Sequence, residues 1–137
     1  MDLLGVSEAS HSKVIRLLDY AILVDEILAL DDAVNYVVIA SVEGGIIYSK
    51  TKYTERLIDE KEEKVLASDL SVMKLMQGLY NDSMGRVTCM LTLREKIHQL
   101  VYFVDHLTIY VSCERDMDTK KIVEVKKKIE SIIKKSV

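Results

Sequence analysis

The sequence predicts an α+β domain in the order helix, two strands, helix, three strands, helix. Two kinds of pattern predict this order. Apolar residues recur at helical spacing up to about residue 30, again from about 65 to 80, and once more toward the end of the chain. Strand patterns flank Glu43-Gly44-Gly45 and continue from about Gly85 to Glu114. The 137 residues suit one domain, 1–137, large enough to bury a core without metals or disulfides.

Composition and charge exclude several classes of protein. The 19 basic residues are balanced by 22 acidic ones, so no overall field attracts nucleic acid. The sequence shows no cationic-plus-apolar leader and no apolar run near ~18 residues, so we expect a cytoplasmic protein that does not insert into membranes. The two cysteines do not resemble a secreted disulfide framework.

The first helix is predicted to begin near Ser7 or Ser10 and to end at about Leu30. It is apolar over more than half of its circumference, so we expect a second helix or a partner to cover part of it. One stripe has steps of three and four, and further apolar residues widen it on both sides: Val14, Leu17, Ala21, Val24 and Leu28, with Ile15, Leu18, Ile22, Tyr20 and Ile27.

Two strands and a second helix follow. The unbroken apolar run Tyr36–Ala40 predicts a strand that is buried on both faces, and the glycine turn returns the chain as a strand at Ile46–Tyr48. The charged stretch from Tyr53 to Lys64 predicts a solvated loop. The helix beyond it is predicted to have one apolar face, formed by Leu66, Leu70, Met73, Met76 and Tyr80. Three further apolar residues flank this face: Val65, Val72 and Leu79. Met73, Met76 and Met84 suit either core filling or adaptable partner contacts.

Three strands then form a tight meander. Turns at Glu95-Lys96 and Asp105-His106 place His98 opposite both Leu93 and Cys113 and sort the side chains into two faces. The core face is predicted to hold Leu91, Leu93, Leu100, Tyr102, Val104, Leu107, Ile109 and Val111. The amphipathic face is predicted to hold Thr88, Met90, Thr92, Gln99, Val101, Phe103, Thr108, Tyr110 and Ser112.

The last helix is predicted to begin near Asp116 or Asp118. Its apolar stripe is Ile122, Val125, Ile129 and Ile132. Lysines 126, 127, 128, 134 and 135 occupy the remaining surface, and with Glu124 and Glu130 among them we interpret this surface as solubilising rather than as a site for nucleic acid or anionic membrane.

No residue cluster predicts a reaction. Cys89 and Cys113 would lie roughly 16 Å apart at sheet spacing, which is too far for a shared metal or a disulfide. A metal site of His98, Cys113 and a helix residue, or a Cys113–His98 nucleophilic pair, stays open as a minor alternative. The glycine turn has neither the glycines nor the lysine of a phosphate loop, and the acidic residues from Asp59 to Glu63 indicate a charged surface. We therefore predict no catalytic residue, no cofactor and no metal.

The element order and two segments resemble the Roadblock/LC7 family, the dynein light chain and small-GTPase-associated modules. The resemblance rests on Val37–Ser49, with its strand, glycine turn and strand, and on Val87–Val111, which resembles the three-strand meander. It covers the chain from about Ser7 to Ile133. Similar domains occur in archaeal proteins of undetermined role, and the usage of lysine, glutamate and isoleucine fits such a source.

The resemblance implies a Roadblock/profilin-like five-stranded antiparallel sheet with the first and last helices on one face and the second on the other. It also implies a homodimer through the second helix and third strand, and a non-enzymatic adaptor for a small Ras-like GTPase, motor or scaffold protein. We expect the interface to include Val72, Met73, Met76, Leu79, Thr88, Met90 and Thr92. A PAS-, GAF- or profilin-like sensor, with a ligand cavity beneath Tyr102 and His98, is the alternative.

Overall fold

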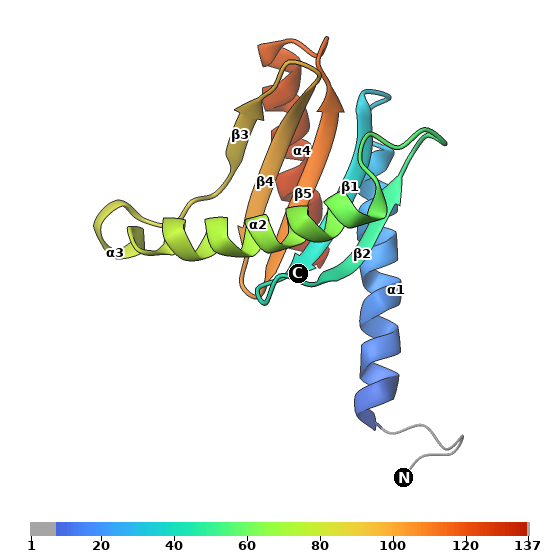
Figure 1. Ribbon diagram of the computed structural model, residues 1–137, viewed down its shortest axis with the longest axis vertical. Helices are drawn as coiled ribbons and strands as arrows, with labels where there is room; N and C mark the ends of the chain where they lie inside the picture. Colours follow the sequence, from blue (N-terminus) through green and yellow to red (C-terminus); the bar gives the residue numbers. More distant parts are fainter. Residues whose placement is uncertain (1–7, 137) are drawn as a thin grey trace.

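The computed structural model describes the backbone of residues 8–136 and the side chains of residues 17–136. Helices and strands follow in the predicted order, with one short helix added (Figure 1). The elements are α1 (Glu8–Leu28), β1 (Val34–Ser41), β2 (Ile46–Thr51), α2 (Glu60–Gly78), α3 (Asn81–Met84), β3 (Met90–Leu93), β4 (Ile97–Val104), β5 (Leu107–Glu114) and α4 (Thr119–Ser136).

The five strands form one antiparallel sheet in the order β2-β1-β5-β4-β3. The predicted register of the meander is confirmed, because His98 lies opposite Cys113 and Leu93, and Val104 lies opposite Leu107. The β1–β2 turn is also as expected: Gly44 has a φ of 91°, which glycine adopts without strain.

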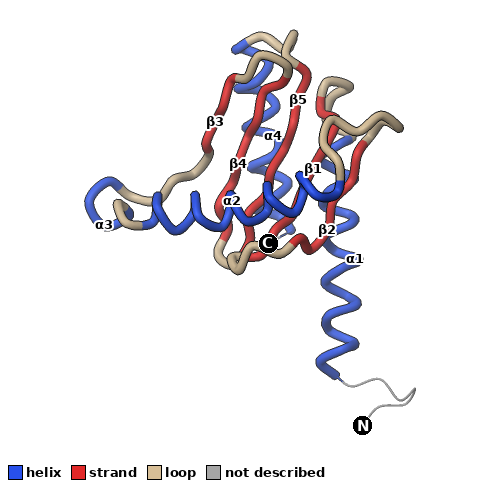
Figure 2. The backbone as a smooth tube through the Cα atoms, viewed as in Figure 1, coloured by secondary structure: helices blue, strands red, loops and turns tan. Residues whose placement is uncertain are grey.

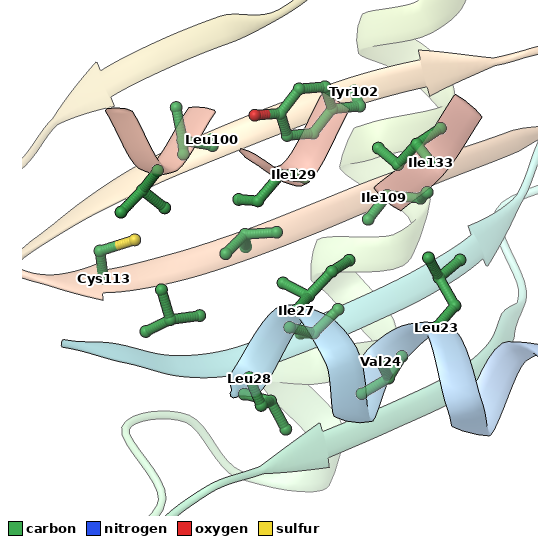
Figure 3. Packing of buried hydrophobic residues seen from close by; sticks show 14 of the residues in the cluster. Leu23, Val24, Ile27, Leu28, Leu100, Tyr102, Ile109, Cys113, Ile129 and Ile133 are labelled. Carbon is green, nitrogen blue, oxygen red and sulfur yellow. The ribbon is translucent and has the colours of Figure 1, made fainter. Parts of the chain in front are cut away.

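Helices cover both faces of the sheet, with α1 and α4 on one face and α2 on the other (Figures 1 and 2). The larger cluster packs α1 and α4 against alternate strand residues; Figure 3 shows Ile27 and Leu23 of α1 near Ile129 and Ile133 of α4. The smaller cluster lies under α2 and is made by Tyr36, Val38, Ala40, Ala67, Leu70, Val101 and Tyr110. The predicted sorting of the two faces is thus confirmed for β4 and β5.

The second helix begins earlier than predicted. Residues 60–64 are helical, not loop, because Asp59 accepts a hydrogen bond from the Glu62 amide at 2.8 Å and Glu62 reaches back to the Asp59 amide. This capping box lies inside the charged stretch that was predicted to be solvated.

The third strand is shorter than predicted and forms the edge of the sheet. Thr88 precedes β3, because the chain returns from α3 outside the sheet before it pairs with β4. The prediction that Leu91 and Leu93 belong to the core is wrong: they are 45% and 64% exposed, since this edge strand is not covered as β4 and β5 are.

Two details of the outer helices differ from the prediction. Ile133 of α4 is buried, whereas the predicted Ile132 is only partly buried. Asp118, one of the two predicted starting residues of α4, is confirmed as its cap, because it accepts a hydrogen bond from the Lys121 amide at 2.8 Å. In α1, the predicted Ser7 start lies outside the described residues, and Leu17, Leu18 and Ile22 are exposed although they continue the apolar pattern.

Candidate interaction surface

Helix α2 has two apolar faces. Glu63, Ala67 and Leu70 are buried against the sheet, and the partly buried Leu66 and Met73 flank them. On the opposite side, Val65, Val72, Met76 and Leu79 are all more than half exposed. With Asp69 these residues repeat at steps of four and three, the spacing with which one helix packs along another.

The predicted interface residues of α2 do not all lie on the same side of the helix. Val72, Met76 and Leu79 lie on the exposed face, as an interface requires. Met73 packs instead against the cluster under α2. Met76 and Tyr80 do not share the sheet-facing side with Leu70, because the helix turns them toward solvent.

The predicted residues near the third strand lie at the open edge of the sheet. Thr92 is exposed within β3, Met90 is half-buried against the cluster under α2, and Thr88 is exposed before the strand. Strand β3 pairs with β4 on one side only, so the backbone groups of its other side face outward. An unpaired edge beside exposed apolar residues is a site at which another strand can add.

Several residues of this surface were not predicted. Leu75 is 73% exposed, and Leu91 and Leu93 project from the other side of β3. Met84, for which core filling and partner contact were both open, is 74% exposed. The spacing of Leu75, three residues after Val72 and four before Leu79, could have identified it as part of the same side of the helix. We call the α2/β3 surface the following set: Val65, Val72, Leu75, Met76, Leu79, Tyr80 and Met84, with the edge Met90–Leu93.

Part of the sheet beside α2 is not covered by the helix. An open groove of about 1080 Å³ runs between the first half of α2 and the β3–β4 hairpin. Leu66 and Asp69 line it from the helix, Leu93 and Arg94 from the hairpin, and Tyr110 from the sheet. The groove borders the α2/β3 surface, so a helix that packed along the exposed stripe of α2 would also cover bare sheet.

Polar contacts fix α2 on the sheet. The buried Glu63 carboxylate accepts hydrogen bonds from the Tyr36 hydroxyl, from Ser49 at 3.0 Å and from Arg56 at 3.0 Å. Burial raises the pKa of Tyr36, and the adjacent Glu63 carboxylate raises it further. Tyr36 thus stays a protonated donor. The prediction that the acids from Asp59 to Glu63 only face solvent is therefore wrong for Glu63.

A second set of contacts holds the middle of α2 at one end of the sheet. Ser71 donates to the carbonyl of Val42 in the β1–β2 turn. The Lys74 ammonium donates to the carbonyls of Asp105 and Leu107 at the β4–β5 turn, the latter at 3.3 Å. Burial lowers the pKa of Lys74. Beyond these contacts a groove of about 570 Å³ opens between the end of α2, Arg86 and Phe103.

The histidine and cysteines lie on the other side of the sheet, away from this surface. His98 and Cys113 are buried, and the His98 Nδ1 atom has no hydrogen-bond partner among the described residues. Burial raises the pKa of Cys113 to about 12, so this thiol is a poor nucleophile. The predicted cavity region beneath Tyr102 is occupied by α4, whose Lys126 carbonyl accepts from the Tyr102 hydroxyl at 3.3 Å.

Two further findings concern the described part of the chain. Among the side chains of residues 17–136, no group of three or more His, Cys, Asp or Glu is arranged to hold a metal ion. Over the same residues, no helix combines the length and apolarity that crossing a bilayer requires.

Comparison with solved structures identifies the fold. A Roadblock/LC7 domain from Streptomyces avermitilis superimposes with a TM-score of 0.65, at 12% identity over 83% of this chain and 91% of that one. The fold of this chain is the Roadblock/LC7 fold. MglB of Myxococcus xanthus gives 0.65 at 14% identity, over 83% and 90% of the two chains. A structure titled MglB with tetrameric arrangement gives 0.58 at 12% identity, over 91% and 93%.

Comparison of the sequence, unlike comparison of the structure, finds no relative. No protein-family model matches it, and neither does any curated protein. The likeness to the solved structures therefore establishes the five-stranded architecture with helices on both faces.

Proposed function

We propose that this chain is a non-enzymatic interaction module that works as a homodimer through the α2/β3 surface. The observation that carries the proposal is the second apolar stripe of α2, at helix-packing spacing, beside an unpaired strand edge. A two-fold axis beside β3 would pair the β3 strands of two copies and place the α2 stripes against each other. Each α2 would then cover the open groove of its partner.

The chemistry of the surface supports an interaction module more than an enzyme. Its exposed residues are leucine, valine, methionine and tyrosine with Thr92, a mainly apolar set that suits burial between proteins and contains no His, Cys, Asp or Glu. Among the side chains of residues 17–136, the only buried histidine is on the opposite face of the sheet, and the thiol across from it is also buried.

Size-exclusion chromatography with light scattering tests the dimer. We expect about twice the chain mass of 15.6 kDa at high salt, and a monomer for Leu79→Glu, because a carboxylate would lie in the apolar contact. Leu18→Glu is the matched control, since Leu18 is 61% exposed on α1 on the other side of the sheet. A wild-type monomer at micromolar concentration would refute the dimer.

We further propose that the dimer regulates or tethers a small Ras-like GTPase or a scaffold protein. The sequence resemblance to Roadblock/LC7 modules and the fold shared with MglB support this partner class. Calorimetry with purified Ras-like GTPases from the same organism, loaded with GDP or a GTP analogue, tests it. We expect one nucleotide state to bind the wild-type dimer and neither to bind Leu79→Glu. If no such GTPase binds in either state, the partner belongs to another class.

A further inference from the structure

The two helices that share one face of the sheet, α1 and α4, carry opposite charge over their described side chains. Helix α4 holds seven lysines and two glutamates, which leaves twelve basic and twenty acidic residues for the rest of the chain. The described side chains of α1 and the loop after it, residues 17–32, include no lysine or arginine and five acids. Because α1 and α4 pack side by side on one face of the sheet, a basic strip lies next to an acidic one.

The basic strip is formed by one side of α4. It lies opposite the buried stripe of that helix, is interrupted by Glu124, and consists of Lys120, Lys127, Lys128, Lys134 and Lys135, all of them exposed. The other two lysines are engaged within the chain: Lys121 pairs with Asp31 at 2.9 Å and Lys126 with Glu130 at 2.5 Å. None of the five strip lysines forms an ion pair with any described residue.

The acidic strip follows the outer side of α1 and includes exposed apolar residues. Leu18 and Ile22 are 61% and 57% exposed, with Asp19 and Glu26 beside them. Asp25 pairs with Lys50 of β2, whereas Asp19 and Glu26 pair with no cation among the described residues. Two exposed apolar side chains beside two unpaired acids form a surface that a basic helix can cover.

Measured along the helix axes, the acids of α1 lie at the same levels as lysines of α4. The Asp31–Lys121 ion pair sets the end of α1 beside the start of α4, and Asp19 and Ser136 line one small groove at the opposite end of α4. The helices are therefore antiparallel. At about 1.5 Å per residue, Glu26 falls level with Lys127 and Lys128, and Asp19 with Lys134 and Lys135.

We propose that this α1/α4 layer is a second self-association surface, on which α1 of one copy lies along α4 of another. A two-fold axis that lies between the copies and runs parallel to the helices places the acidic strip of each copy against the basic strip of the other. Each contact therefore forms twice. Because the axis preserves height, it places Glu26 against Lys127 and Lys128 and Asp19 against Lys134 and Lys135 without any shift. Ile22 is covered between these two levels.

The acidic strip is what favours a second copy over a polyanion. Nucleic acid or an anionic bilayer would meet Asp19 and Glu26 in the same layer as the lysines, and like charges would repel. The basic strip also has no arginine or aromatic residue, the side chains that bind nucleobases. A copy of the chain offers both signs at the required positions.

The size and chemistry of the contact indicate a weak, salt-dependent association. Two helices about 27–30 Å long and about 10 Å wide give a footprint of roughly 500 Å² per copy, less than the ~800 Å² per partner of stable complexes. Most of its attraction is between exposed charges, which salt screens. The layer lies on the face of the sheet opposite α2, so it can join the dimers proposed above into tetramers or longer assemblies.

Sedimentation velocity at low and high salt tests the layer, using two charge-reversed variants. In the first, Asp19→Lys and Glu26→Lys make both strips basic; in the second, the four changes Lys127→Glu, Lys128→Glu, Lys134→Glu and Lys135→Glu make both strips acidic. For the wild type we expect twice the high-salt mass at low salt and high concentration. Each variant alone should keep its high-salt mass, whereas an equal mixture should associate again, because opposite strips then face each other.

A matched charge control distinguishes contact between the strips from a general effect of net charge. Glu43→Lys with Glu55→Lys changes net charge as the first variant does, but outside the layer, and should leave the low-salt association intact. If the α2/β3 dimer does not form, low salt should still double the monomer mass, so the two proposals fail independently. A mass that salt does not change, no rescue in the mixture, or lysine-dependent binding to phosphatidylserine vesicles without self-association would overturn the proposed α1/α4 contact.

Discussion

The Tyr36 hydroxyl on β1 donates a hydrogen bond to the Glu63 carboxylate on α2, and this pair joins the helix to an interior strand of the sheet. Arg56 donates to the same carboxylate oxygen as Tyr36, and Ser49 donates to the other oxygen. A buried carboxylate is stable only when its charge and lone pairs are matched in this way. The position of α2, and with it the direction of the α2/β3 surface, therefore depends on a polar contact.

Removing the Glu63 carboxylate should destabilise the fold. Glu63→Ala leaves the Tyr36 hydroxyl and the Arg56 guanidinium without their acceptor, and we expect a loss of about 3 kcal/mol in the free energy of unfolding. Urea denaturation measures it. Glu60→Ala, at an exposed position in the same helical turn, should change stability by no more than about 0.5 kcal/mol. Equal losses in the two variants would contradict a structural role for the network.

The free energy of unfolding should depend on pH through the ionisation of Asp31. The Lys121 ammonium and the Ala33 amide hold the pKa of Asp31 below its usual 3.8, so the folded state favours the carboxylate. A lowered pKa contributes stability above the unfolded value, and this is lost as pH falls through the folded one. The deficit of Asp31→Asn at pH 7 should shrink below about pH 4. Asp32→Asn is the control, and a deficit independent of pH would refute the assignment.

The cysteines should differ in reactivity. Burial raises the pKa of Cys113 to about 12 and also raises the pKa of the half-buried Cys89. In native protein at pH 8 we expect iodoacetamide to leave Cys113 unmodified and to label Cys89 slowly, while both label rapidly in urea. Mass spectrometry of tryptic peptides distinguishes the sites. Rapid native labelling of Cys113 would revive a Cys113–His98 nucleophilic pair.

A side chain at Gly44 should destabilise the fold. Its φ of 91° strains any other residue, and an added Cβ would lie 3.4 Å from the Ser68 Cα atom of α2. We expect Gly44→Ala to lower the free energy of unfolding by about 1–2 kcal/mol. Gly45→Ala should cost less, because its Cβ meets only the Ser41 hydroxyl oxygen at 3.5 Å. Thermal unfolding of both variants measures the difference; an equal cost would show that the positive φ is not what matters.

The register of the meander was predictable because two short turns determine it. Once Asp105-His106 is a turn, alternation assigns each residue of β4 and β5 to a face, and a slip by one residue would reverse every assignment. The start of α2 was also readable: Asp59 and Glu62 stand three residues apart before an apolar run, which is a capping box. It was missed because the surrounding charges resembled a loop.

Other features depend on tertiary structure that no local pattern contains. Leu91 and Leu93 alternate like core residues, and only the extent of helical cover at the edge of the sheet leaves them exposed. Glu63 looks like any surface acid until Tyr36, Ser49 and Arg56 surround it from three other segments. The two sides of α2 were both visible in the sequence, but not which of them the sheet covers.

Ser71 and Lys74 hold the middle of α2 to the backbone carbonyls of two hairpin turns at the same end of the sheet. A helix fixed in this way has little freedom left to lose when something binds to its outer side. A flexible segment loses conformational entropy when it associates, and this loss weakens binding. In α2 the same loss has already occurred during folding. Loosening those two contacts, with the apolar stripe unchanged, should therefore weaken association at this helix by slowing its capture and hastening its release.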